Sequence, residues 1–256
     1  MADGAVADTA VSDDAFLGSR LRLTQPREGH RAGSDAILLA AAAPADVAGL
    51  ALDVGAGVGS AGLALAALRP GLLFGLVEND PMLAALAGGN IARNDMAERG
   101  AVYRCDVLDR ASRQAAGLED GSARLVITNP PFFDEGRVRA SSDSGKRSAH
   151  VMGEGADLGA WIFACLALLV ESGMLVMIHR PESLPAILAA LGQRAGDIAL
   201  KPVQPNADKS ATRILVRARK SRRGPLVITP ALVLHDGRGF TPESEALHRG
   251  AELLKW

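Results

Sequence analysis

The segment LVITNPPFF, residues 125–133, ends an apolar run with an amide, two prolines and two aromatic rings. The side-chain oxygen of Asn129 and the backbone carbonyl of Pro130 could accept hydrogen bonds from an amino group conjugated to a ring, which would free its lone pair for attack. The prolines fix φ and would preorganise both acceptors, and Phe132 could stack on a flat substrate. The alternative is a turn with a core phenylalanine. The candidate catalytic residues are Asn129, Pro130, Pro131 and Phe132.

A second chemical pattern, LDVGAGVG, occupies residues 52–59 and also ends an apolar run. Its three glycines, Gly55, Gly57 and Gly59, can adopt positive φ and allow a ligand to approach the backbone closely. The N–H groups at the start of the following helix favour anionic groups. The pattern therefore predicts a ligand-binding loop, and the alternative is a tight turn that binds nothing.

Two acidic residues follow the next two apolar runs. Glu78 stands 19 residues after Gly59 (78 − 59) and could accept both hydroxyls of a ribose. Asp106 could accept a hydrogen bond from an adenine amino group, so the three loops together describe an adenosine-shaped site. Residues 57–62 also match the dinucleotide pattern GxGxxG. Asp53 argues against that cofactor, because a carboxylate would repel a pyrophosphate.

These residues require a framework in which several strands end at one edge. From residue 50 onward, apolar strand patterns alternate with helical patterns, which predicts an α/β fold with a doubly wound, mostly parallel, seven-stranded sheet. No helix separates the last two strands, so one edge strand is expected to be antiparallel. Ligands of such sheets lie beyond the carboxyl ends of the strands. The usual strand order places the fourth strand beside the first, and therefore Asn129 beside the glycine loop.

The chain divides into four parts by composition. Residues 1–15 are small and acidic and are expected to form a disordered tail. Residues 16–49 predict a ribbon and a helix that pack on the core, with Ser34 as the helix N-cap. Residues 50–220 form the expected cofactor-binding core. Residues 221–256 predict a C-terminal extension without evident chemistry.

Composition limits the class of protein. Hydrophobic residues make up 48% of the 256 residues, charged residues 22%, and the net charge is −1, so any nucleic-acid surface must be local. The first residues lack the pattern of a signal peptide and no apolar run is long enough for a membrane helix, so neither is expected. Cys105 and Cys165 lie far apart without metal-binding spacing, which predicts buried thiols, no metal and a reducing compartment such as the cytoplasm.

Basic residues gather in two places. The loop after the asparagine motif could hold phosphates beside a flipped-out nucleotide, and the alternative is a solvated loop. The candidate substrate-binding residues there are Phe132, Phe133, Arg137, Arg139 and Arg147. The second cluster could form an electrostatic track for RNA or a solvated sheet edge. Its members are Arg213, Arg217, Arg219, Lys220, Arg222 and Arg223.

Both motifs resemble those of a known family. The pattern Asp-x-Gly-x-Gly-x-Gly from Asp53 resembles motif I of class I methyltransferases, and Asn-Pro-Pro-Phe from Asn129 resembles motif IV of amino-group methyltransferases. With GSDAILL at 33–39 and KRSAH at 146–150, residues 16–220 resemble the methyltransferase-small family, especially bacterial adenine-N6 methyltransferases of valine tRNA. This resemblance implies the Rossmann-like class I fold and S-adenosylmethionine as the cofactor.

The resemblance also implies roles for individual residues. An acidic residue at Asp53 would serve the amino group of the methionine part, and Asp35 would lie near the same end of the cofactor. The expected activity is methylation of adenine N6 in tRNA. Guanine N2 of ribosomal RNA and a protein glutamine remain alternatives, since Phe132 replaces the more usual tyrosine. A nicotinamide-dependent oxidoreductase and a non-catalytic RNA-binding module are less favoured. The expected cofactor-binding residues are Asp35, Asp53, Gly55, Gly57, Gly59, Glu78, Asp106 and Asn129.

Overall fold

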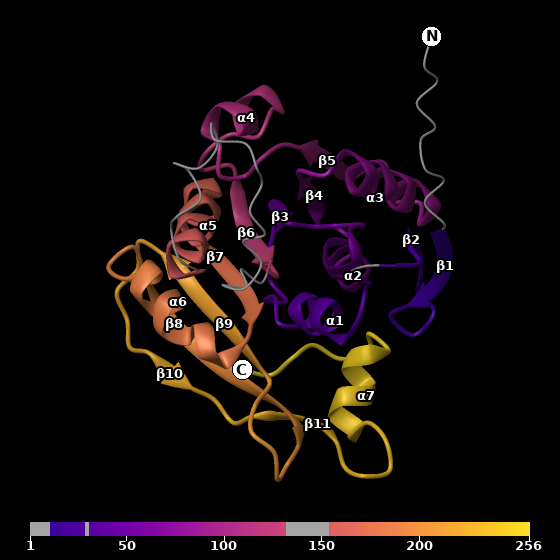
Figure 1. Ribbon diagram of the computed structural model, residues 1–256, viewed down its shortest axis with the longest axis vertical. Coiled ribbons are helices and arrows are strands. Elements are labelled where there is room, and N and C mark those ends of the chain that lie inside the picture. The colour runs from indigo at the N-terminus through magenta and orange to yellow at the C-terminus, as the bar shows by residue number, and fades with distance from the viewer. Residues whose placement is uncertain (1–10, 29–30, 132–153) are drawn as a thin grey trace, which may run out of the picture.

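A single large sheet runs through the molecule (Figure 1). A computed structural model of the chain describes residues 11–28, 31–131 and 154–256, the side chains of 154–157 excepted. The sheet has nine strands in the order β5-β4-β3-β6-β7-β9-β8, and both β10 and β11 pair with β8. A separate ribbon pairs β1 with β2. The strands are β1 Val11–Phe16, β2 Leu21–Pro26, β3 Leu50–Val54, β4 Leu73–Glu78, β5 Gly100–Arg104, β6 Ala123–Thr128, β7 Leu169–His179, β8 Ala195–Asn206, β9 Arg213–Lys220, β10 Val227–Ile228 and β11 Leu232–His235.

The predicted fold class is confirmed, with two corrections in the sheet. The sheet has nine strands rather than seven, because the short strands β10 and β11 add to β8. The antiparallel strand β9 is not an edge strand, since it lies between β7 and β8 and runs opposite to both. The connection between β8 and β9 is only six residues long, 207–212, so the two form a hairpin that lays β9 back against β7.

Helices cover both faces of the sheet. Helices α1, α2, α3 and α7 pack on one face, and α5 and α6 pack on the other, over two separate buried apolar clusters. No helix in the described ranges combines the length and apolar character needed to span a membrane. The helices are α1 Ser34–Ala41, α2 Ser60–Leu68, α3 Pro81–Arg93, α4 Arg110–Ala115, α5 Glu154–Leu168, α6 Leu184–Leu191 and α7 Pro242–His248, with a 3₁₀ turn at Pro181–Ser183.

The N-terminal ribbon corrects the predicted disordered tail. Residues 11–15 belong to β1 and pair with β2. Their acidic side chains are neutralised by arginines, because Asp13 lies 2.7 Å from Arg22 and 2.9 Å from Arg93. The hydrogen bond from Arg22 lowers the pKa of Asp13. Acidic composition alone indicated disorder, but pairing with distant arginines allows a strand.

Helices α3 and α1 begin in different ways. Asp80 caps α3 by accepting hydrogen bonds from two backbone N–H groups, and Pro81 occupies the first position, where its missing N–H costs nothing. Helix α1, in contrast, is capped at Gly33 without a side-chain bond, so the N-cap prediction for Ser34 was wrong. The Ser34 hydroxyl instead lies 2.9 Å from Nε2 of His248, on helix α7.

The C-terminal extension is fastened to the other end of α1. The backbone N–H of Leu254 donates to the carbonyl of Ala41 at 3.0 Å. The indole N–H of Trp256 donates to the carbonyl of Ala42 at 2.9 Å. The guanidinium of Arg217 lies 4.5 Å from the centre of the Trp256 ring. Since His248 contacts the helix start, the extension holds α1 at both ends.

Candidate active site

The predicted site residues meet where the parallel strands end. Val54 of β3 lies opposite Thr128 of β6 in the sheet register. The residues that follow these two, Gly55 and Asn129, are therefore neighbours at the carboxyl edge of the sheet. Glu78 ends β4, on the other side of β3. The structure thus brings the glycine loop, the acidic residue and the asparagine motif together.

The glycine loop has the backbone conformation that its sequence predicts. Gly55, Gly57 and Gly59 have φ values of +74°, +57° and +88°, a region that favours glycine. A β-carbon at Gly57 would meet no atom within 4 Å, and Gly55 is exposed. A β-carbon at Gly59 would instead lie 2.6 Å from Leu76. Gly57 therefore borders open space in which a ligand can reach the backbone, whereas Gly59 is needed for packing.

Glu78 ties the glycine loop to the end of β4. One carboxylate oxygen accepts the N–H of Gly57 at 2.7 Å, and the other accepts the N–H of Asp80 at 2.9 Å. Each oxygen can accept more than one hydrogen bond. The carboxylate is held by two backbone donors and retains acceptor capacity for the hydroxyl groups of a ribose.

Asp53 is buried beneath the loop. Its side chain is only 4% exposed, and its Oδ2 accepts the N–H of Gly62 at 2.7 Å. Burial raises the pKa of Asp53 to about 7; the Gly62 N–H lowers it and the nearby Glu78 raises it further. Asp53 therefore fastens the first turn of α2 to β3. Its contact with the amino group of a cofactor remains a prediction.

Two further acidic candidates lie at the same edge. Asp106 follows β5, is exposed, and accepts the N–H of Leu108 at 2.9 Å. Asp35, in the first turn of α1, accepts a hydrogen bond from Nε of Arg213 at 2.7 Å. Arg213 begins β9 where β7 ends, which places Asp35 near the carboxyl end of β7. Their roles in cofactor binding remain predictions.

The asparagine motif is described only in its first three residues. Asn129 is half-buried, Pro130 is buried and Pro131 is exposed. The amide therefore stands at the surface of the carboxyl edge, on a segment that the prolines stiffen. The remaining candidates lie outside the described residues, and they are Phe132, Phe133, Arg137, Arg139 and Arg147.

Trp161 is a site residue that the sequence did not reveal. Its indole N–H donates to the Thr128 hydroxyl at 3.0 Å, and that hydroxyl donates to the Val54 carbonyl at 2.8 Å. A β-carbon at Gly55 would lie 2.9 Å from the Trp161 ring. The indole on α5 thus locks the ends of β3 and β6 together. Thr128 lies 33 residues from Trp161 in the chain, and no local pattern marks this pairing.

The second basic cluster divides between the two edges of the sheet. Arg213 and Arg217 lie toward α1. Arg213 forms an ion pair with Asp35, and Arg217 lies against the Trp256 ring. Arg219 and Lys220 end β9 at the opposite, amino edge. Within the described ranges, no group of three or more histidine, cysteine or acidic side chains is arranged to hold a metal ion.

Comparison with known proteins identifies similar sequences. Residues 31–145 match the model of the family "methyltransferase small domain". The chain is 27% identical to a tRNA1(Val) (adenine(37)-N6)-methyltransferase of Cronobacter sakazakii over 81% of this chain and 82% of that protein. It is 36% identical to the protein of the same name from Escherichia coli, over 48% of this chain and 49% of the relative. The latter alignment thus spans about half the relative's length.

Solved structures share the whole architecture. A protein from Agrobacterium tumefaciens described as a "predicted O-methyltransferase" is 31% identical, with a TM-score of 0.72, over 86% of this chain and 98% of that chain. A Pyrococcus horikoshii protein, TYW2 in complex with MeSAdo, is 13% identical with a TM-score of 0.53 and supports the fold alone. The first structure therefore extends the similarity to 86% of this chain.

Proposed function

The chain belongs to the methyltransferase small-domain family of S-adenosylmethionine-dependent methyltransferases, and from this premise we propose that it methylates N6 of an adenine in tRNA. The predictions of a methyltransferase and of its cofactor are thereby confirmed. The substrate proposal is supported by the names of the sequence relatives. The single structural observation that carries it is Asn129, which the register places beside the glycine loop.

The residues present fit the cofactor. Gly57 borders open space, and the Glu78 carboxylate stands at the end of the adjacent strand with acceptor capacity for ribose hydroxyls. Asp106 would accept from the adenine amino group, and Asp35 lies toward the other end of the site. When bound, S-adenosylmethionine supplies a methyl group carried on a sulfonium, which is activated for transfer to a nucleophile.

The chain's own contribution to the reaction is orientation and hydrogen-bond acceptance. An amino group on an aromatic base is a weak nucleophile, because its lone pair is delocalised into the ring. The Asn129 amide oxygen and the Pro130 carbonyl would accept its two N–H groups and favour tetrahedral geometry at nitrogen. The prolines hold these acceptors in place before reaction, so little reorganisation is required in the transition state.

A nitrogen acceptor fits this site better than an oxygen acceptor. A hydroxyl group must lose its proton as it attacks, which requires a base within reach. An asparagine amide is not a base, but it accepts a hydrogen bond from an N–H donor. Asn129 therefore favours amino-group methylation in this chain, even though the solved relative is described as a predicted O-methyltransferase.

Incubation of the protein with total RNA and labelled S-adenosylmethionine, followed by nucleoside analysis, tests the proposal. The expected product is N6-methyladenosine in the tRNA fraction. Label in 2-methylguanosine, in an O-methylated nucleoside or in protein would show that another acceptor is used. We also propose that the protein acts in the cytoplasm, where it would meet tRNA.

A further inference from the structure

Two hollows lie at the amino edge of the sheet, opposite the glycine loop. The first, of about 300 Å³, is formed between residues 44–48, the start of β6, residues 172–174 of β7 and the end of β9. The second, of about 290 Å³, lies between α5, the residue before β8 and the end of β9. Since β6 is six residues long, the amino and carboxyl edges are about 20 Å apart.

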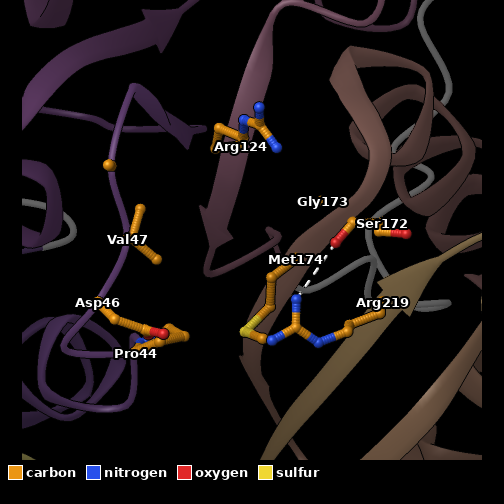
Figure 2. A pocket seen from close by; sticks show the side chains of 9 residues that line it. Pro44, Asp46, Val47, Arg124, Ser172, Gly173, Met174 and Arg219 are labelled. Atoms are coloured by element: carbon orange, nitrogen blue, oxygen red, sulfur yellow. Dashed lines mark hydrogen bonds between the residues drawn. The ribbon is translucent and has the colours of Figure 1, made fainter.

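Each hollow is lined by two cations. Arg124 and Arg219 line the first, and Figure 2 shows the Arg219 guanidinium beside the side chain of Met174 of β7, with Arg124 apart from them on β6. Arg194 and Lys220 line the second. Neighbouring residues of a strand point to opposite faces of the sheet. Arg219 and Lys220 therefore carry positive charge to both faces at the end of β9, and the hollows adjoin around it.

The four cations keep most of their hydrogen-bonding capacity. Arg219 donates to the carbonyl of Ser172 at 3.3 Å, and Lys220 donates to the carbonyl of Leu169 at 2.7 Å. Arg194 lies 4.5 Å from the centre of the Phe163 ring. Within the described parts of the chain, none of the four forms an ion pair with a carboxylate.

The charge of this surface differs from that of the whole protein. Four cations line the two hollows, and Asp46 is the one carboxylate among the lining residues. The complete chain has a net charge of −1, so this concentration is local. Guanidinium and ammonium groups with free N–H donors suit phosphate oxygens, and a run of such groups suits a polyanion.

We propose that Arg124, Arg194, Arg219 and Lys220, here called the amino-edge surface, bind the phosphate backbone of the RNA substrate at a distance from the methylated base. The inference rests on the proposed function, because it assigns this surface to the same RNA. A short stem–loop held at the carboxyl edge would not reach around the sheet. A complete, folded tRNA is large enough to contact both edges.

The test compares two double variants that each remove two positive charges. Arg124→Gln with Arg194→Gln alters the amino-edge surface without removing a side-chain hydrogen bond described above. Arg238→Gln with Lys255→Gln is the matched control, because both residues are exposed and lie on the C-terminal extension. Binding of labelled full-length tRNA is measured from low to moderate salt, roughly 50 to 200 mM, and methylation is measured on tRNA and on the isolated stem–loop that carries the target.

The amino-edge variant is expected to bind tRNA about ten-fold more weakly at the low-salt end of this range. Its slope of log affinity against log salt should fall by about 1.5, since each phosphate contact contributes roughly 0.7–0.9. KM should rise for tRNA but not for the stem–loop, with kcat unchanged, and the control should match the wild type.

Equal tRNA affinity in the two variants would overturn the proposal that the amino-edge surface binds RNA. An equal rise in KM for tRNA and for the stem–loop would overturn it too. Absence of any salt-dependent RNA binding by the wild type overturns it as well. If the wild type binds tRNA with the expected salt slope but methylates neither RNA, the proposed function fails. The binding comparison would still show whether the amino-edge surface contacts tRNA.

Discussion

At the scale of single residues, the site uses two carboxylates in different ways. Glu78 is half-buried and stands at the surface of the site, where it accepts one hydrogen bond from Gly57 of the glycine loop and one from Asp80. Asp53 is buried, and its hydrogen bond anchors α2. A buried carboxylate disfavours its own ionised form. The contribution of Asp53 to stability should therefore depend on pH.

The unfolding free energy of the wild type should fall as pH rises toward 7, relative to Asp53→Asn. The folded pKa of Asp53, about 7, exceeds its ordinary value of 3.8, so the folded protein binds this proton more tightly than the unfolded chain. The resulting stability is complete below pH 3.8 and is lost as pH rises through 7. An asparagine side chain does not titrate. Chemical denaturation at about pH 5 and pH 8 should show a difference of about 2–3 kcal/mol.

The amide variant also distinguishes two possible roles of Asp53, which are to anchor α2 through Gly62 and to contact the amino group of the cofactor. The side-chain oxygen of the substituted amide could still accept the Gly62 N–H, so the loop should keep its shape and its affinity for S-adenosylhomocysteine if the carboxylate serves only α2. A large loss of affinity would assign Asp53 to the cofactor's amino group. A wild-type-to-variant stability difference that stays constant across the same pH range would contradict the raised pKa.

At the scale of elements, the junction of β3, β6 and α5 is close-packed around Gly55. Gly55→Ala should destabilise the protein by about 1–3 kcal/mol more than Gly57→Ala. Both glycines have positive φ, so both substitutions carry similar backbone strain. Only at Gly55 does the new methyl group meet the Trp161 ring, at 2.9 Å. Thermal or chemical denaturation of the two variants measures the difference.

A double-mutant cycle provides the control for this comparison. Replacing Trp161 by Leu should reduce the additional cost of Gly55→Ala, since the ring that blocks the methyl group is absent. Gly57→Ala should cost the same in either background. Equal costs for the two glycine substitutions in the wild-type background would show that the indole does not restrain the loop.

Local patterns were sufficient to predict most elements. Apolar runs that end in glycine loops or acidic residues predicted β3, β4 and β5. They did not predict contacts between distant segments. Ser34 was a plausible N-cap by type, but its hydroxyl meets His248 instead, 214 residues away. In the N-terminal ribbon, strand β1 likewise depends on contacts with residues outside it, because Arg22 and Arg93 both form ion pairs with its Asp13.

The candidate site was predictable to the same extent. Gly55, Gly57, Glu78 and Asn129 are brought together as expected, because parallel strands end at one edge of the sheet. The packing that fixes them was not predictable, since Trp161 approaches from a helix with no chemical motif. Their individual roles in binding and catalysis remain predictions.

At the scale of the whole molecule, the C-terminal extension stabilises the helix that carries Asp35. Trp256→Leu should lower the unfolding free energy by about 1–3 kcal/mol, because it removes the hydrogen bond to Ala42 and the stacking on Arg217. Hydrogen exchange in α1 should accelerate. Lys255→Gln is the matched neighbour, with a side chain 84% exposed, and should change stability by less than about 0.5 kcal/mol. Unchanged exchange in α1 would show that the extension does not hold this helix.

The central claim is that Asn129 accepts hydrogen bonds from the amino group that is methylated. Single-turnover methylation by Asn129→Ala, together with its affinity for S-adenosylhomocysteine, tests this most directly. The rate should fall by about 10²–10³, as for the loss of one preorganised polar partner. The affinity should stay within about two-fold of wild type, because the glycine loop and Glu78 are intact. A near-normal rate would contradict the account and would make Asn-Pro-Pro a turn of the fold without a part in catalysis.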